Sequence, residues 1–111
     1  MTCFSITSEE IAGVDWSEPW SFQLSGLEKE LEKELIPGHV LHARTTLAVA
    51  RHEGRDDILF LVDDEAYPLA VVHLTWVRET DPRWPYAERY SSIQEFLDHR
   101  LLPDSKEYTE G

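Results

Sequence analysis

The stretch Asp57–Val77, DILFLVDDEAYPLAVVHLTWV, decides the fold of this chain. It contains two apolar, strand-like runs, Asp57–Val62 and Leu69–Val77, which are separated by DDEAYP. Asp and Pro favour turns, so this link predicts a reversal of the chain. A third strand-like run, His39–Arg51, comes before them and is joined by the turn-like HEGR. Strands joined by short loops become antiparallel neighbours, and these runs therefore predict a three-stranded meander, with a four-stranded one as the alternative.

The segment SGLEKELEKEL predicts an amphipathic helix before the first of these strands. Leucines recur at helical spacing from Leu24 to Leu35, and Glu and Lys fill the other faces. Ser25, followed three residues later by Glu28, has the pattern of a capping box, in which each side chain binds the other residue's backbone N–H. Pro37-Gly38 is expected to end the helix.

A second helix is predicted to follow RETDPRWPYAERY, a stretch too rich in proline and charge for a regular element. This helix begins at Ser91, with Gln94 three residues later as its capping partner. Pro103 is expected to end it, because proline cannot continue a regular helix, and residues 104–111 are expected to form a frayed tail. The apolar face of the helix consists of Ile93, Phe96, Leu97 and Leu101.

Both faces of the predicted sheet are apolar, which a sheet facing water does not tolerate. A symmetrical turn between the last two strands would place Ile58 opposite His73. We expect the two helices to cover one face. The other face would be covered by residues 1–23, a partly ordered segment with two tryptophans, by a second copy of the chain, or by a partner. The sequence thus predicts one α+β domain, residues 1–111, with an antiparallel meander and two amphipathic helices on one face.

The chain is strongly acidic, with 22 Asp and Glu against 10 Lys and Arg and a formal net charge of −12. We expect no binding to nucleic acid or to anionic membranes, because both require cationic groups. A basic macromolecule would be attracted, although solubility alone also accounts for such a charge. The single cysteine, Cys3, excludes an intrachain disulfide, and neither a signal peptide nor a membrane span is recognisable. These features predict a cytoplasmic protein.

His73, set inside the apolar run AVVHLTW, is the candidate functional histidine. It is interpreted first as a histidine at the core or its edge, hydrogen-bonded to a carbonyl, hydroxyl or carboxylate. The alternative is a base beside a substrate pocket. Thr75 would share its sheet face, but the sequence contains no nucleophile elbow or recognisable triad order. We therefore assign no catalytic residue.

Metal and cofactor motifs are not found in the sequence. His39 and His42 form an HxxH pair, but side chains three residues apart on a strand point to opposite sides. Asp56-Asp57 and Asp63-Asp64-Glu65 coincide with predicted turns, where Asp is favoured for its backbone hydrogen bonds. The glycines are scattered singly and form no phosphate-binding loop. The prediction is no metal and no cofactor.

Trp84-Pro85-Tyr86 is the stretch with the strongest features of a contact site. Rigid aromatic side chains on a loop lose little entropy on binding, so they serve well as contact residues. The alternative is that Trp84 folds back over an edge of the core. The predicted partner-binding residues are Trp84, Tyr86, Trp76 and Arg78.

The run Ala70–Trp76, followed by Pro82-Arg83-Trp84-Pro85 and by the helix start Tyr90-Ser91-Ser92, resembles a group of small uncharacterised bacterial proteins. The resemblance covers roughly residues 27–103. It implies a bacterial, cytoplasmic origin and one compact α+β domain. It carries no established activity and transfers no catalytic residue.

Three functions are compatible with these features. The first is an acidic protein-binding module, for example an immunity or antitoxin-type protein that neutralises a basic partner. The second is a structural or regulatory homodimer, which would bury the second face of the sheet. The third is a small enzyme or ligand binder that uses His73. We favour the first, because the chain combines high acidity with aromatic loop residues and lacks a catalytic set.

Overall fold

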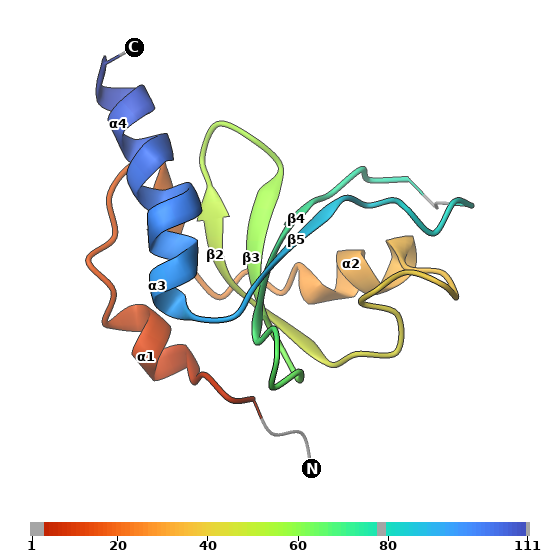
Figure 1. Cartoon of the computed structure of the whole chain (residues 1–111). Helices are drawn as coiled ribbons and strands as arrows, with labels where there is room; N and C mark the ends of the chain where they lie inside the picture. Colours follow the sequence, from red (N-terminus) through yellow and green to blue (C-terminus); the bar gives the residue numbers. More distant parts are fainter. Residues whose placement is uncertain (1–3, 78–79, 111) are drawn as a thin grey trace.

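A computed structural model describes residues 4–77 and 80–110 of the chain. Its centre is a five-stranded antiparallel sheet, in which strands adjacent in sequence are also adjacent in space (Figure 1). The predicted α+β meander is confirmed as strands two to four of this sheet, and one further strand lies at each edge. The strands are β1 (Trp20–Phe22), β2 (Thr46–His52), β3 (Asp57–Val62), β4 (Leu69–His73) and β5 (Ala87–Tyr90).

Helices lie on both sides of the sheet, so the prediction that two helices share one face is wrong. Figure 1 shows α2 on one side, with α1 and the long C-terminal helix on the other. Both faces are apolar, and the chain divides its helices between them. Among the described residues, no helix is long and apolar enough to cross a membrane. The helices are α1 (Ser8–Ala12), α2 (Glu28–Glu34) and the C-terminal helix, in which α3 (Ile93–Phe96), a π-helical turn η1 (Leu97–Leu101) and α4 (Leu102–Glu110) are continuous.

Each face of the sheet has its own apolar core. On one side, Ile11 of α1 and Phe96 of α3 belong to the same cluster as Trp20. On the other side, Leu31 of α2 and Leu41 of the following loop pack with the opposite side chains of the sheet. The chain itself therefore shields both faces, which removes the reason for expecting a second copy on the reverse side.

The register of β3 against β4 differs from the expected one by one residue. His73 lies opposite Asp57, whereas the sequence analysis placed it opposite Ile58. Because successive side chains of a strand alternate, a slip of one residue moves a whole strand to the other face. A bulge between Ala48 and Ala50 also shifts β2 against β3. The β3–β4 register brings Asp57, rather than an apolar residue, next to His73.

Two glutamates of α2, Glu28 and Glu34, accept backbone hydrogen bonds from β2 and from the turn after β4. The expected capping box does not form, because the carboxylate of Glu28 accepts a hydrogen bond from the Ala48 backbone N–H at the bulge, at 3.0 Å. Glu34 is fully buried, and its carboxylate accepts hydrogen bonds from the backbone N–H and hydroxyl of Thr75 and from the backbone N–H of Trp76. This anchor holds Trp76 at a φ of 62°, and the strand ends at His73 rather than at the expected Val77.

The edge strands and the first long strand were the least predictable parts of the sheet. The segment 1–23, expected to be partly ordered, contributes α1 and β1 to the described structure. The stretch between β4 and the last helix was expected to have no regular element, but its end forms β5. The run His39–Arg51 was expected to be one strand, yet residues 39–43 form a bend and turns, and β2 begins only at Thr46.

The C-terminal helix begins one residue later and ends much later than expected. Its N-cap is Ser92, whose hydroxyl accepts from the Glu95 backbone N–H, while the Glu95 carboxylate accepts from the backbone of Ser91. Pro103 does not end the helix. It follows the π-helical turn η1, a widened turn that lets a helix accommodate a residue unsuited to regular hydrogen bonding. Residues 104–110, expected to fray, continue the helix as part of α4.

Candidate functional site

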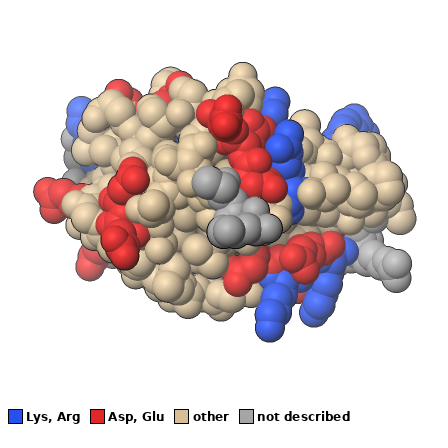
Figure 2. All heavy atoms as spheres, turned by 90° about the horizontal axis from the view of Figure 1, so that it is seen from below, with Lys and Arg blue, Asp and Glu red and all other residues tan. Residues whose placement is uncertain are grey.

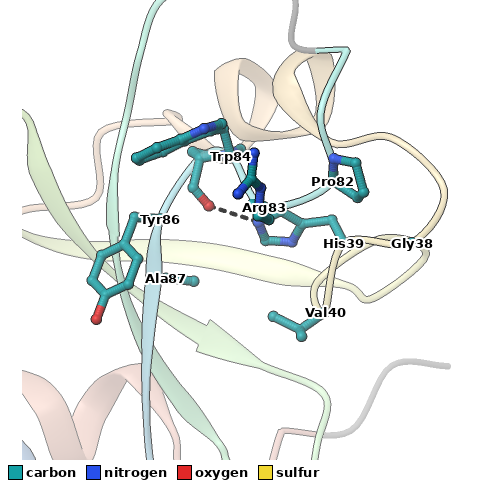
Figure 3. Close-up of a pocket in the computed structure, with 9 residues that line it drawn as sticks. Gly38, His39, Val40, Pro82, Arg83, Trp84, Tyr86 and Ala87 are labelled. Atoms are coloured by element: carbon teal, nitrogen blue, oxygen red, sulfur yellow. Dashed lines mark hydrogen bonds between the residues drawn. The ribbon is translucent and has the colours of Figure 1, made fainter.

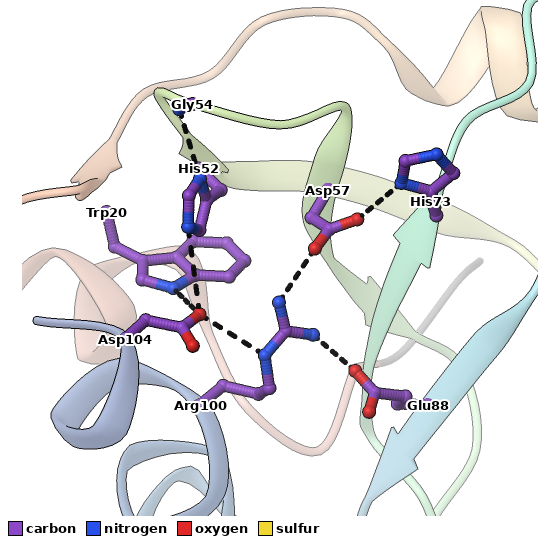
Figure 4. Close-up of polar contacts among 8 residues, drawn as sticks. All are labelled: Trp20, His52, Gly54, Asp57, His73, Glu88, Arg100 and Asp104. Atoms are coloured by element: carbon purple, nitrogen blue, oxygen red, sulfur yellow. Dashed lines mark hydrogen bonds and ion pairs between the residues drawn. The ribbon is translucent and has the colours of Figure 1, made fainter. Parts of the chain in front are cut away.

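A network of charged side chains connects the C-terminal helix to three strands of the sheet (Figure 4). Its centre is Arg100 of η1, whose side chain is 11% exposed. The guanidinium donates to Asp57 at 2.7 Å, to Glu88, and to Asp104 at 3.3 Å. Burial lowers the pKa of Arg100, but the bond to Asp57 and the charges of Glu88 and Asp104 outweigh it and raise that pKa above the ordinary value. Arg100 is therefore charged under all ordinary conditions.

Asp57 connects this network to His73. The His73 Nδ1–H donates to the Asp57 carboxylate at 2.8 Å, and Arg100 binds the second oxygen of the same carboxylate. Burial would raise the pKa of Asp57, but the hydrogen bonds from Arg100 and His73 hold it below its ordinary value. Asp57 is thus ionised at neutral pH and fixes the orientation of the imidazole.

The free side of His73 faces an open cavity of about 480 Å³. The His73 side chain is 55% exposed, so it is not a core histidine, although its bond to a carboxylate agrees with the first interpretation of the sequence. With its proton on Nδ1, neutral His73 presents the lone pair of Nε2 outwards as an acceptor. A carboxylate that orients a histidine in this way is also the geometry of a general base. The cavity is lined by Arg55, Asp57, Val71, His73, Tyr86, Glu88 and Arg100, none of which is a serine, threonine or cysteine nucleophile.

At its other end the network secures β1 to the C-terminal helix. The indole Nε1–H of Trp20 donates to Asp104 at 2.9 Å, and His52 Nε2 lies 3.8 Å from the same carboxylate oxygen. The Gly54 backbone N–H donates to His52 Nδ1, so the proton of neutral His52 is on Nε2. Burial is the main reason that the pKa of His52 is lowered. His52 therefore has a packing role in this network.

A second, apolar cavity lies beside the loop that leads into β5 (Figure 3). It has a volume of about 560 Å³, and Trp84 and Tyr86 line it while remaining 47% and 57% exposed. Trp84 is thus presented outwards rather than folded over the core. Buried His39 holds the wall in place, since its Nδ1 accepts from the Leu41 N–H at 3.0 Å and its Nε2–H donates to the Pro85 carbonyl at 2.7 Å.

Tyr86 belongs to both cavities. It lines the apolar cavity together with Trp84, and it lines the polar cavity together with His73 and Glu88. The backbone N–H of His73 also donates to the Tyr86 carbonyl at 3.1 Å, which joins the two walls directly. The two cavities therefore form one composite surface with an aromatic half and a polar half.

The predicted partner-binding residues are only partly brought together. Trp84 and Tyr86 line the same cavity. Trp76 is exposed too, but it lines a different hollow against α2, together with Val77 and Glu30. Arg78 lies outside the described residues. His39 of the HxxH pair is a structural residue, and the described part of the chain contains no group of three or more side chains suited to a metal ion.

The sequence analysis missed Arg100, Glu88 and Asp104 as members of the site. Arg100 had a detectable signal, because it is four residues after Phe96 and therefore lies on the apolar face of its helix. A charge on an apolar face requires a buried partner. Asp104 continues that face one turn later and binds Arg100 in the structure.

Comparison of the chain with protein-family models, with curated proteins and with solved structures gives no match. The chemistry of the composite surface is therefore interpreted from its own geometry. It combines exposed aromatic rings, an oriented histidine and a carboxylate network.

The hydrogen bonds predict one tautomer for His73 and the other tautomer for His39 and His52, and NMR can check this. Long-range ¹H–¹⁵N spectra of the neutral rings should place the proton of His73 on Nδ1, because this nitrogen donates to Asp57. The same spectra should place the proton on Nε2 in His39 and His52. Exposed His42 is the internal reference for an imidazole at the surface. A proton on Nε2 of His73 would contradict the Asp57–His73 bond.

Proposed function

We propose that the protein is an acidic protein-binding module whose partner carries basic groups, in the manner of an immunity or antitoxin-type protein. One observation carries the proposal. Trp84 and Tyr86 are both about half exposed, and they line one apolar cavity on a loop that His39 holds in place. A bacterial, cytoplasmic setting is part of the proposal and rests on the sequence resemblance.

The aromatic cavity has the properties of an anchor site. Large aromatic side chains supply much contact area, and a loop that is already fixed loses little entropy when a partner binds. Pro85 is buried and its carbonyl accepts the His39 hydrogen bond, so the two rings on either side of it are presented from a rigid turn. A cavity of about 560 Å³ is large enough for one or two partner side chains.

The charge of the molecule supports a basic partner. The formal net charge is −12, and Figure 2 shows several separate patches of Asp and Glu on the face that it presents. Such a field steers a basic protein into encounter and repels acidic competitors. The aromatic cavity would then supply the short-range contacts, and the acidic surface would increase the rate of association.

Photo-crosslinking in cells of the source organism tests the proposal. A photoreactive phenylalanine analogue replaces Tyr86 in one strain and Tyr67 in another, because Tyr67 is also exposed but lines neither cavity. We expect position 86 to give a cross-linked adduct with a basic protein and position 67 to give none with it. Identical adducts at both positions, or adducts only with acidic proteins, would refute the proposal.

A second candidate function, a small enzyme or ligand binder that uses His73, is favoured by the Asp57–His73 pair beside an open cavity. His73 would accept a proton from a bound substrate or water, while Asp57 stabilises the resulting imidazolium. An NMR screen of small metabolites, observed on the His73 ring signals, tests it. Submillimolar binding of a neutral or anionic metabolite would favour this candidate over a protein partner.

A further inference from the structure

The composite surface has a polar half that the aromatic anchor does not use. We infer that the cavity beside His73 receives an arginine side chain of the basic partner, while an apolar neighbour of that arginine fills the cavity at Trp84 and Tyr86. This inference rests on the proposed function and specifies the chemical group that the site recognises.

The polar cavity presents hydrogen-bond acceptors to its ligand. His73 is fixed by Asp57 with the Nε2 lone pair outwards. One carboxylate oxygen of Glu88 accepts from Arg100, and within the described part of the chain its second oxygen accepts no hydrogen bond. A ligand that fits two such acceptors must be a donor, and a guanidinium offers several donors in one plane.

The charges around the cavity favour a cation as well. The cavity lining carries Asp57 and Glu88 against Arg55 and Arg100, so its own charges balance. Asp104 binds Arg100 from outside the cavity and leaves the whole group with one negative charge in excess. An incoming arginine would complete the balance, whereas a phosphate or carboxylate ligand would add to the excess.

Tyr86 explains why the cation and the apolar residue belong to one partner segment. It lines both cavities, so a residue in one cavity and its neighbour in the other would both lie next to Tyr86. A guanidinium beside an aromatic ring gains a cation–π interaction in addition to its hydrogen bonds. The surface therefore fits a short segment with an arginine next to an apolar side chain.

A pair of dipeptides tests the inference on the intact protein. The probes are acetyl-leucyl-arginine amide and acetyl-leucyl-citrulline amide, which share their shape but differ in charge. We expect the arginine peptide to shift the NMR signals of His73 and Tyr86 and to bind about fivefold more tightly than the citrulline peptide, the size of one partly exposed ion pair. Equal affinities, or shifts confined to other parts of the molecule, would overturn the inference.

Two variants locate the binding site. Glu88→Gln should remove most of the preference for arginine over citrulline, while Glu65→Gln, the same change of charge on the exposed β3–β4 loop, should leave it unchanged. If Glu88→Gln perturbs the Arg100 network, Tyr86→Ala is the second variant, and it should weaken both peptides. An unchanged preference in Glu88→Gln, together with unchanged affinities in Tyr86→Ala, would also overturn the inference.

The pH dependence gives an independent test. Protonation of His73 converts its Nε2 from an acceptor into a donor and adds a positive charge facing Arg55 and Arg100. Binding of the arginine peptide should therefore weaken when acidification protonates His73. His73→Gln should abolish this dependence, and His42→Gln should retain it. A pH dependence that survives His73→Gln would argue against His73 as the acceptor.

The failure of this inference is distinguishable from failure of the proposed function. If position 86 cross-links to a basic protein but the dipeptides bind equally, the arginine is refuted and the proposed function stands. If position 86 gives no specific adduct and the dipeptides also bind equally, both are refuted. Displacement of the arginine peptide by a tighter neutral metabolite would refute the inference in favour of a small-ligand site.

Discussion

Arg100→Met is expected to lower the free energy of unfolding by about 3 to 5 kcal/mol at neutral pH, because removal of one partner leaves the buried charges opposite it uncompensated. Asp57, Glu88 and Asp104 all depend on this guanidinium, and the side chains of Asp57 and Asp104 are largely buried. Urea denaturation followed by tryptophan fluorescence measures the effect, since Trp20 contacts the same network.

The loss should depend on pH in a defined direction. The pKa of Asp57 is held below its ordinary value in the folded protein, so its stabilisation is present above the unfolded pKa and is lost as the pH falls through the folded one. The difference between wild type and Arg100→Met should therefore shrink below about pH 4, where unpaired carboxylates become protonated. A difference that grows on acidification would contradict this account.

Arg83→Met is the matched control for the same chemical change. Arg83 also forms a bidentate ion pair, with Asp81, and this pair lowers the pKa of Asp81 to about 2. However, the Arg83 side chain is exposed, and surface ion pairs contribute little to stability. We expect no measurable change in unfolding. A loss equal to that of Arg100→Met would mean that burial does not determine the effect.

Glu34→Ala is expected to destabilise the protein by about 3 kcal/mol, because it leaves several buried donors unsatisfied at once. The carboxylate of Glu34 holds the turn at Thr75 and Trp76, where Trp76 has a positive φ. Chemical denaturation should show the loss, and hydrogen exchange should accelerate at the amides of Thr75 and Trp76 before it does in β3. Glu34→Gln should be milder, since its carbonyl oxygen can still accept from one or two of these donors.

Glu32→Ala removes a glutamate two positions away on the same helix and is the control. Glu32 is exposed, so its loss should change stability by less than about 0.5 kcal/mol. Similar losses for Glu32→Ala and Glu34→Ala would show that helix content, rather than the buried hydrogen bonds, determines the result. Unchanged exchange at Trp76 in Glu34→Ala would show that the turn does not need its anchor.

The central part of the fold was predictable from the sequence. The apolar runs that form β3 and β4 lie on either side of a strong turn signal, and the leucines of α2 recur with a helical period. These signals are local and long. The division of the helices between two faces was not predictable, because it depends on register, and a slip of one residue at Asp57 reverses the faces of β3.

The predictions for the edge strands of the sheet and for the end of the last helix were wrong, for different physical reasons. Strands β1 and β5 are short, and the partner strand beside each of them supplies the order that their own residues do not signal. Pro103 is a strong helix breaker in isolation, yet the widened turn η1 accommodates it. In both cases tertiary context overrides a local preference.

The candidate site was partly predictable. His73 and the pair Trp84 and Tyr86 were singled out because an imidazole in an apolar run and aromatic side chains in a loop are unusual. Their assembly around one surface depends on the pairing of β4 with β5, which brings Tyr86 to His73. Arg100 was not singled out, although its spacing from Phe96 already placed it on the buried side.

The bond between Trp20 and Asp104 joins residues 84 positions apart. During synthesis on the ribosome, the indole of Trp20 emerges long before the carboxylate that it needs. The hydrogen bond that joins β1 to the C-terminal helix therefore cannot form until that helix has left the exit tunnel. We expect the nascent chain to become resistant to proteases in a single late step, rather than strand by strand as it emerges.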